Sequence, residues 1–63
     1  MADFQLTLTD EERTLLAEFL THELKEKRVE EHRTDSLAYR QIVARQEQLI
    51  ERLLNKLGPV AVA

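Results

Sequence analysis

The sequence predicts an all-α protein, an antiparallel two-helix hairpin that dimerises into a four-helix bundle. Two stretches, residues 10–33 and 37–57, repeat apolar side chains at spacings of three and four, which is typical of amphipathic helices. Neither stretch contains Gly or Pro. Between them stand Thr34, Asp35 and Ser36, three residues that prefer caps and turns. All 63 residues are therefore assigned to one small domain, whose marginal core favours association with further copies.

The composition argues against several classes of protein. There is no cysteine, which excludes disulfides and thiolate zinc sites. No apolar run approaches the ~20 residues that span a bilayer, and the first residues lack the basic and apolar regions of a signal peptide. We therefore expect a cytoplasmic protein with no membrane association.

Charge is unevenly distributed along the chain. Residues 1–33 carry nine acidic and five basic side chains, whereas residues 34–63 carry three acidic and four basic ones. Opposite balances favour packing of the two halves against each other. The net charge of −3 argues against a general nucleic-acid binder, which usually has a basic excess.

The first nine residues are predicted to form an extended arm. Phe4, Leu6 and Leu8 alternate with polar residues, but the run is too short to make an independent sheet. The arm is expected to lie on the helices or on a partner. Thr9 then caps the first helix, and Glu12, three residues later, completes a capping box.

The helix over residues 10–33 is apolar in its first half and polar in its second half. The second half is expected either to be more exposed to water or to bury the stems of the Lys27 and Arg28 side chains in place of a full apolar stripe. The apolar residues between positions 15 and 24 cover about half of the helix circumference. They are Leu15, Leu16, Phe19, Leu20 and Leu24.

The turn is predicted at residues 34–36. His32 and Arg33 suit the negative end of the first helix dipole, and Asp35 suits the positive end of the second. A single helix running through this segment is the less favoured alternative, because it would be a rod of about 50 residues with its weakest point here. The absence of Gly from the segment keeps that alternative open.

The helix over residues 37–57 has a wider apolar face than a two-helix contact requires. Gly58 and Pro59 stop it, and residues 58–63 form a tail. In the expected hairpin, Leu20 lies near Leu49. A heptad frame predicts a seam with Val43, Ile50 and Leu57 at a, Tyr39, Gln46 and Leu53 at d, Ile42 and Leu49 at g, and Leu54 at e.

A second hairpin would cover the apolar positions that the first helix leaves free, giving a homodimer or a higher oligomer. Gln46 is a polar residue within this face, where it either fixes the alignment of the helices or reaches the rim. The predicted oligomer interface comprises Tyr39, Ile42, Val43, Gln46, Leu49, Ile50, Leu53, Leu54 and Leu57.

One charged cluster raises the question of a metal site. Glu18, His22, Glu23 and Glu26 lie close together on the first helix and have the donor atoms for a divalent ion. Diiron bundles, however, place a Glu three residues before each His, and neither His22 nor His32 has one. A solvated charged face is the preferred interpretation, so no metal or other cofactor is expected.

A basic strip on the second helix, formed by Arg45, Arg52 and Lys56, is the candidate nucleic-acid contact. Pairing with acids of the same chain, such as Glu23 or Glu51, is the preferred interpretation. No catalytic constellation or phosphate-binding loop is present, which predicts that the protein is not an enzyme.

The span of residues 8–57 resembles a family of small bacterial helical-hairpin proteins of unknown function. The resemblance rests on a junction, Arg-Val-Glu followed by Arg-Thr-Asp, and on a second helix that ends in Leu-Leu-x-Lys-Leu. It implies a hairpin and carries no activity. The matching residues are Arg28, Val29, Glu30, Arg33, Thr34, Asp35, Leu53, Leu54, Lys56 and Leu57.

The favoured function is a non-enzymatic, self-associating interaction or structural module. One alternative is a small RNA- or DNA-binding regulator, because the length and the predicted architecture also resemble the plasmid RNA-binding regulator Rop, without a shared motif. Another is a regulator whose second helix binds in a groove of a different protein.

Overall fold

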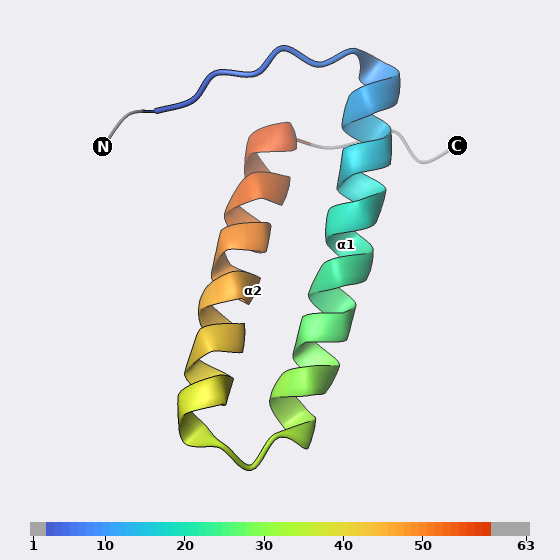
Figure 1. Cartoon of the computed structure of the whole chain (residues 1–63). Helices are drawn as coiled ribbons and strands as arrows, with labels where there is room; N and C mark the ends of the chain where they lie inside the picture. Colours follow the sequence, from blue (N-terminus) through green and yellow to red (C-terminus); the bar gives the residue numbers. More distant parts are fainter. Residues whose placement is uncertain (1–2, 59–63) are drawn as a thin grey trace.

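The computed structural model describes residues 3–58, which form two antiparallel helices joined by a short connection (Figure 1). Helix α1 spans Asp10–Arg33 and helix α2 spans Leu37–Leu57. The two helices pack against each other along their length, which confirms the all-α, two-helix fold. The continuous-rod alternative is wrong, because the chain reverses direction at residues 34–36.

The start of α1 is fixed by the predicted capping box. The Thr9 hydroxyl accepts a hydrogen bond from the Glu12 backbone N–H at 3.1 Å, and the Glu12 carboxylate accepts one from the Thr9 N–H at 2.9 Å. Two backbone donors that the helix itself leaves free are therefore satisfied. These bonds also lower the pKa of Glu12, chiefly because the Thr9 backbone N–H stabilises the ionised carboxylate.

The turn is built from the side chains of its own short polar residues. The Ser36 hydroxyl caps α2 by accepting from the Tyr39 N–H, and the Thr34 hydroxyl accepts from the Ser36 N–H. Arg40 reaches back from the first turn of α2 and donates to the Thr34 carbonyl at 2.9 Å. These bonds satisfy backbone groups at both helix ends, so the turn needs no glycine.

Gly58 ends α2 with a positive φ of 75°, a backbone conformation that favours glycine. Its N–H donates to the Asn55 carbonyl at 3.2 Å and so closes the last turn of the helix. The predicted Pro59 stop and most of the expected tail lie outside the described residues, as does the beginning of the arm.

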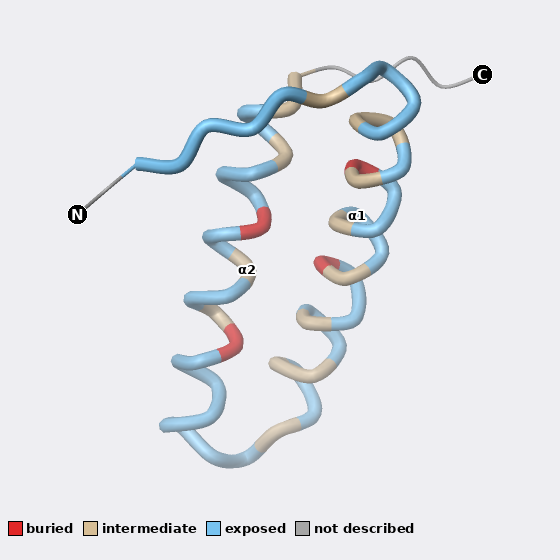
Figure 2. Tube along the Cα trace, turned by 45° about the horizontal axis from the view of Figure 1, so that its top comes forward, coloured by how far each residue is buried: buried red, intermediate tan, exposed pale blue. Residues whose placement is uncertain are grey.

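The hydrophobic core is a narrow seam between the helices. Its buried side chains are Ala17 and Leu24 from α1 and Val43 and Ile50 from α2, and Val43 is only 1% exposed. Figure 2 shows these positions on the facing sides of the two helices, with half-buried and exposed positions around them. Such a seam is small even for a chain of this length, in which marginal cores are the rule.

The structure corrects the predicted seam of α2. Val43 and Ile50 are buried at a, but the d residues Tyr39, Gln46 and Leu53 are exposed. Glu47 and Leu54, both at e, are half-buried instead. Helix α2 is therefore turned so that its a and e positions face α1, and its d and g positions point away from the seam.

Helix α1 shows a similar division. Leu24 is buried and Leu16 and Leu20 are half-buried, as the stripe predicts, but Leu15 and Phe19 are exposed. Ala17, which the stripe omits, is buried in the seam. A small side chain at this position allows α2 to approach closely, and leucines farther round the helix then fall outside the contact.

The arm, residues 3–9, is extended and crosses the open end of the hairpin near the end of α2 (Figures 1 and 2). Leu8 is half-buried, whereas Phe4 and Leu6 are largely exposed. Most of the apolar surface of the arm is therefore exposed, and the expectation that the arm lies on the helices or on a partner stays a prediction.

Candidate functional site

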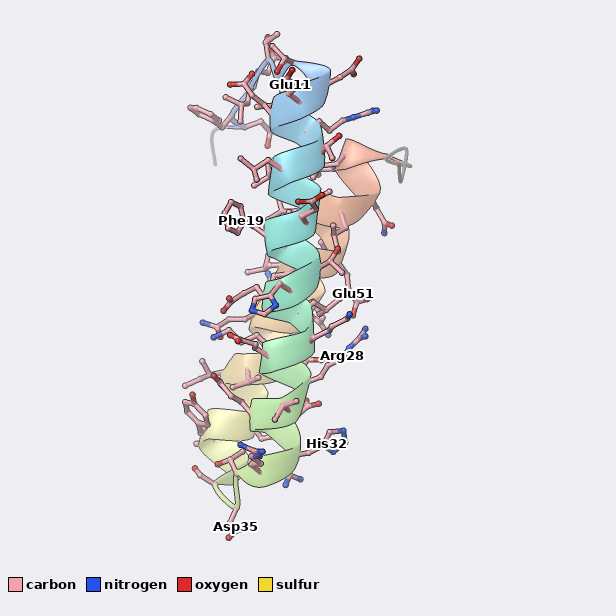
Figure 3. The ribbon with its side chains drawn as sticks, turned by 90° about the vertical axis from the view of Figure 1, so that its right-hand side faces the viewer. Glu11, Phe19, Arg28, His32, Asp35 and Glu51 are labelled. Atoms are coloured by element: carbon pink, nitrogen blue, oxygen red, sulfur yellow. The ribbon has the colours of Figure 1, made fainter. Side chains whose placement is uncertain are left out.

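The most distinctive surface of the hairpin is an apolar face on one of its two broad sides. We define the apolar face by Leu16, Phe19 and Leu20 of α1 and by Tyr39, Ile42, Gln46, Leu49 and Leu53 of α2. On α2 these residues recur at spacings of three and four, so they follow one line along the helix. The exposed fraction of Ile42 is 57% and that of Phe19 is 64%. Figure 3 shows that Phe19 projects to the opposite side from Arg28 and Glu51.

At the open end the apolar face is hollowed into a groove of about 510 Å³. The arm forms one wall of this groove through Phe4, Leu6 and Leu8. Leu16 and Leu20 of α1 form part of the opposite wall, together with the end of α2. The groove is thus an apolar hollow that this chain lines but does not fill.

Towards the turn the apolar face becomes polar on its α1 side. Lys27 lies against the seam with its side chain 20% exposed, as expected of a buried stem, and its ammonium group is 3.6 Å from Glu23 and 3.9 Å from Glu30. The Tyr39 hydroxyl donates to the Glu30 carboxylate at 3.1 Å. Leucines therefore occupy the open half of α1 on this face, and a paired charge cluster occupies the turn half.

The nine predicted interface residues divide into two groups. Val43 and Ile50 are buried against α1, and Leu54 and Leu57 are half-buried, so these side chains serve mainly the hairpin itself. The other five lie on the apolar face, where a partner could contact them. They are Tyr39, Ile42, Gln46, Leu49 and Leu53.

The opposite broad side is an ionic face, which we define by Arg28 of α1 and by Glu47 and Glu51 of α2. The Arg28 guanidinium lies 3.8 Å from the Glu47 carboxylate and 3.5 Å from the Glu51 carboxylate. These contacts join the two helices across one edge of the seam. The sequence does not single out these ion pairs by itself. The signal for them is a basic residue on the first helix together with two acids, Glu47 and Glu51, that lie one turn apart on the second helix.

Glu47 is much less exposed to solvent than Glu51, the other acid of the ionic face. Its side chain is 12% exposed, and its Oε2 atom is buried without a hydrogen-bond partner among the described residues. Loss of water raises the pKa of Glu47, and the nearby Glu31 carboxylate raises it further, while Arg28 opposes the change. The ionic face therefore joins the helices at a cost, because the ionised carboxylate of Glu47 is less stable there than in water.

Arg13 is a further residue that links the two helices and that the sequence does not single out. Its guanidinium donates to the carbonyl of Leu57, the last residue of α2, at 3.2 Å. That carbonyl has no partner within its own helix, and a cation there also suits the negative end of the helix dipole. Arg13 thus caps α2 from the first turns of α1.

The basic strip of Arg45, Arg52 and Lys56 borders the apolar face along the outer edge of α2. Within residues 3–58, none of the three forms an ion pair; Arg45 donates only to Gln48 of its own helix, at 3.5 Å. The predicted pairing of this strip with acids of the same chain is therefore wrong. Helix α2 presents its d and g positions away from α1, which carries the neighbouring basic residues outward as well.

The candidate metal residues do not form a metal-binding site. His22 and Glu26 are paired at 3.1 Å on the exposed side of α1. Across the described chain, no group of three or more His, Cys, Asp or Glu side chains is arranged to hold a metal ion. Neither described helix combines the length and the apolar character needed to cross a membrane.

Comparison with known proteins provides no further identification. No protein-family model matches the chain, and neither the curated proteins nor the solved structures contain a match. The resemblance of the junction and the second helix to a hairpin family therefore stays a prediction. The geometry of the two faces is what remains to support a function.

Proposed function

We propose that the protein is a non-enzymatic interaction module that forms a homodimer through its apolar face, giving a four-helix bundle. The observation that carries this proposal is the unfilled apolar face itself. It runs along α2 from Tyr39 to Leu53 and continues onto Leu16, Phe19 and Leu20 of α1. Contiguous apolar surface of this kind on a small protein usually marks an interaction site.

The exposed area of the single chain supports this proposal. A monomeric protein of 7.4 kDa typically exposes about 4200 Å² of surface. This chain exposes 5643 Å², and the extended arm accounts for part of the excess. A standard protein–protein interface covers about 800 Å² on each partner. A second copy on the apolar face would therefore bring the exposed surface per chain closer to that of an ordinary monomer.

The small size of the core also supports the proposal, because a core of this size gives the single hairpin little stability. Four buried side chains form the seam, and no disulfide or described metal site adds to it. A core of this size rarely supplies more than about 3–5 kcal/mol. Burial of the leucines of the apolar face in a dimer would add to it at about 25 cal/mol per Å² of apolar area.

Sedimentation equilibrium of the wild type and of Leu49→Glu tests the proposal. The wild type is expected at twice the chain mass of 7.4 kDa. Leu49→Glu places one carboxylate per copy in the centre of the interface, and a buried unpaired charge costs several kcal/mol. The dissociation constant should therefore rise by at least about 100-fold.

Gln48→Glu is the matched control, because it adds the same charge at the neighbouring exposed position, away from the apolar face. It should leave the mass unchanged. A wild type that sediments as a monomer at 100 µM would contradict the proposal. A dimer that tolerates Leu49→Glu as well as Gln48→Glu would place the interface elsewhere.

The unpaired basic strip favours nucleic-acid binding as the second candidate function. Arg45, Arg52 and Lys56 follow one outer line of α2 and are available to phosphates. The net charge of −3 opposes this role, so we expect only weak binding that is lost at physiological salt. A sequence-selective gel shift that persists at physiological salt would favour the regulator over the structural module.

A further inference from the structure

We infer that the two copies of the dimer lie with their turns at the same end of the bundle. This inference rests on the proposed function and adds the topology of the dimer to it. A twofold axis can bring two apolar faces together in two ways. If the axis runs along the helices, the turns share one end and α1 lies on the partner's α2. If the axis crosses the helices, the turns lie at opposite ends and α1 lies on the partner's α1.

Two contacts within the hairpin fix which residues lie at the same height. The hydrogen bond between Glu30 and Tyr39 sets the level near the turn, and the bond from Arg13 to Leu57 sets it at the open end. Between these points the two helices run in opposite directions with the same rise per residue. A residue four positions before Glu30 in α1 is therefore about level with the residue four positions after Tyr39 in α2.

An axis along the helices preserves these heights, so each α1 residue of the apolar face meets the partner's α2 residue of the same level. The leucines of the two copies then pack against each other in the half of the bundle near the open ends of the hairpins. In the turn half, Gln46 could donate to the carboxylate of the partner's Glu23, and the stem of the Lys27 side chain could pack on the partner's Ile42. The level pairs are Leu16 with the partner's Leu53, Leu20 with the partner's Leu49, Glu23 with the partner's Gln46, and Lys27 with the partner's Ile42.

An axis across the helices gives a much poorer match. The middle of α1 falls at residues 21–22, so Leu20 would lie level with the partner's Glu23, and Leu16 with the partner's Lys27. Each of these two leucines would then pack against a charged group of the partner and displace the water that hydrates it. Burial of such groups against apolar side chains is unfavourable, because their lost hydration is not replaced.

The charges at the edges of the apolar face favour the same arrangement. Glu12, Glu23 and Glu30 follow one line at the α1 edge, at spacings of 11 and 7 residues. The basic strip follows the α2 edge. With the turns at the same end, the acidic edge of each copy lies beside the basic strip of the other, and Glu23 comes level with the partner's Arg45 to within about one residue. The opposite arrangement would place acidic edge beside acidic edge.

Pairs of spin labels measure the topology directly. Because the chain has no cysteine, Asp35→Cys labels only the turn and Glu11→Cys labels only the open end. Both positions are exposed and lie off the apolar face. With turns at the same end, each label should lie within about 25 Å of its copy, because neighbouring helices pack 8–10 Å apart. With turns at opposite ends, the separation should be about 30–35 Å or more, since each helix residue adds 1.5 Å.

A mixture of two single-cysteine chains gives a second measurement. Leu20→Cys and Leu49→Cys, mixed under oxidising conditions, should yield a disulfide-linked heterodimer in preference to either homodimer. In the opposite arrangement Leu20 would lie near the partner's Leu20, so Leu20→Cys would link to itself. Each variant is first checked for helicity by circular dichroism.

The outcomes separate the inference from the proposed function on which it rests. A dimer with both label distances short, together with the mixed disulfide, supports the shared-end topology. A dimer with either distance long overturns the topology and leaves the proposed function intact. A monomeric mass for the unlabelled wild type defeats the proposed function, and the topology with it.

Discussion

The two broad faces of the hairpin differ in how completely the chain satisfies them. On the ionic face, Arg28 reaches across the seam to Glu47 and Glu51, so both acids have an ion-pair partner within one copy, although one oxygen of Glu47 lacks a hydrogen bond among the described residues. On the apolar face, Ile42, Leu49 and Phe19 have no comparable cover. The difference indicates that one face completes the hairpin and the other is free for association.

A charged substitution in the seam, which lies beneath both faces, should give the largest loss of stability. Ile50 is 8% exposed between α1 and α2, so Ile50→Asp would bury a carboxylate with no cation beside it. Such a group costs several kcal/mol, which is comparable to the whole ~3–5 kcal/mol that a core of this size supplies. We expect helicity and dimer mass to be lost together, as measured by circular dichroism and sedimentation.

The matched control for this change is Glu18→Ala on the exposed surface of α1, which should preserve both properties. A folded, helical monomer from Ile50→Asp would mean that the hairpin is stable without its partner and tolerates the charge. An unchanged dimer would mean that Ile50 lies outside the seam.

A substitution that affects only the ionic face should give a smaller loss of stability. Arg28→Met keeps most of the stem but removes the charge shared by Glu47 and Glu51. Because Arg28 and Glu51 are about half exposed, solvent screens this network and the expected loss is about 1 kcal/mol. Urea denaturation should detect the loss, while the dissociation constant of the dimer should stay unchanged.

Lys25→Met is the control for Arg28→Met, since it removes an exposed positive charge from the same helix with no ion pair among the described residues. Equal losses from the two variants would show that net charge, and not the cross-helix contact, is responsible. A changed dissociation constant for Arg28→Met would break the distinction between the two faces.

The smallest effect concerns the pH dependence of the ionic face. Because the pKa of Glu47 is raised in the hairpin, its protonated form favours folding. Its contribution is present below the ordinary value of 4.5 and is lost as the pH rises through the raised pKa. Glu47→Gln should therefore raise the melting temperature at pH 7, and the gain should shrink as the pH approaches 4.

Glu12 titrates in the opposite sense, which makes a paired comparison necessary. Its pKa is lowered by the cap, so its contribution is present above the ordinary value and is lost as the pH falls through the lowered pKa. Subtracting the wild-type curve from the Glu47→Gln curve removes this common contribution. Glu51→Gln, at the exposed end of the same network, should not reproduce the gain. A gain for Glu47→Gln that is independent of pH would contradict the assignment to ionisation.

Most of the local structure was predictable because its causes lie close together in the sequence. The capping box of Thr9 and Glu12, the polar turn at residues 34–36 and the stop at Gly58 each depend on hydrogen bonds or dihedral angles within a few residues. The spacing of apolar residues then indicates helices on both sides of the turn. These signals suffice for two helices and for the reversal between them.

The rotation of the helices about their own axes depended on the tertiary contact. Helix α2 has an apolar arc wider than one neighbour can cover, and the sequence alone does not say which part of the arc faces α1. Burial of Ala17 and the contacts of Arg28 with Glu47 and Glu51 accompany a seam of a and e positions. The d and g residues Gln46, Leu49 and Leu53 are consequently left on the surface. The buried side chains of α1 that select the seam are at least 19 residues away in the chain from those of α2, beyond the reach of local sequence signals.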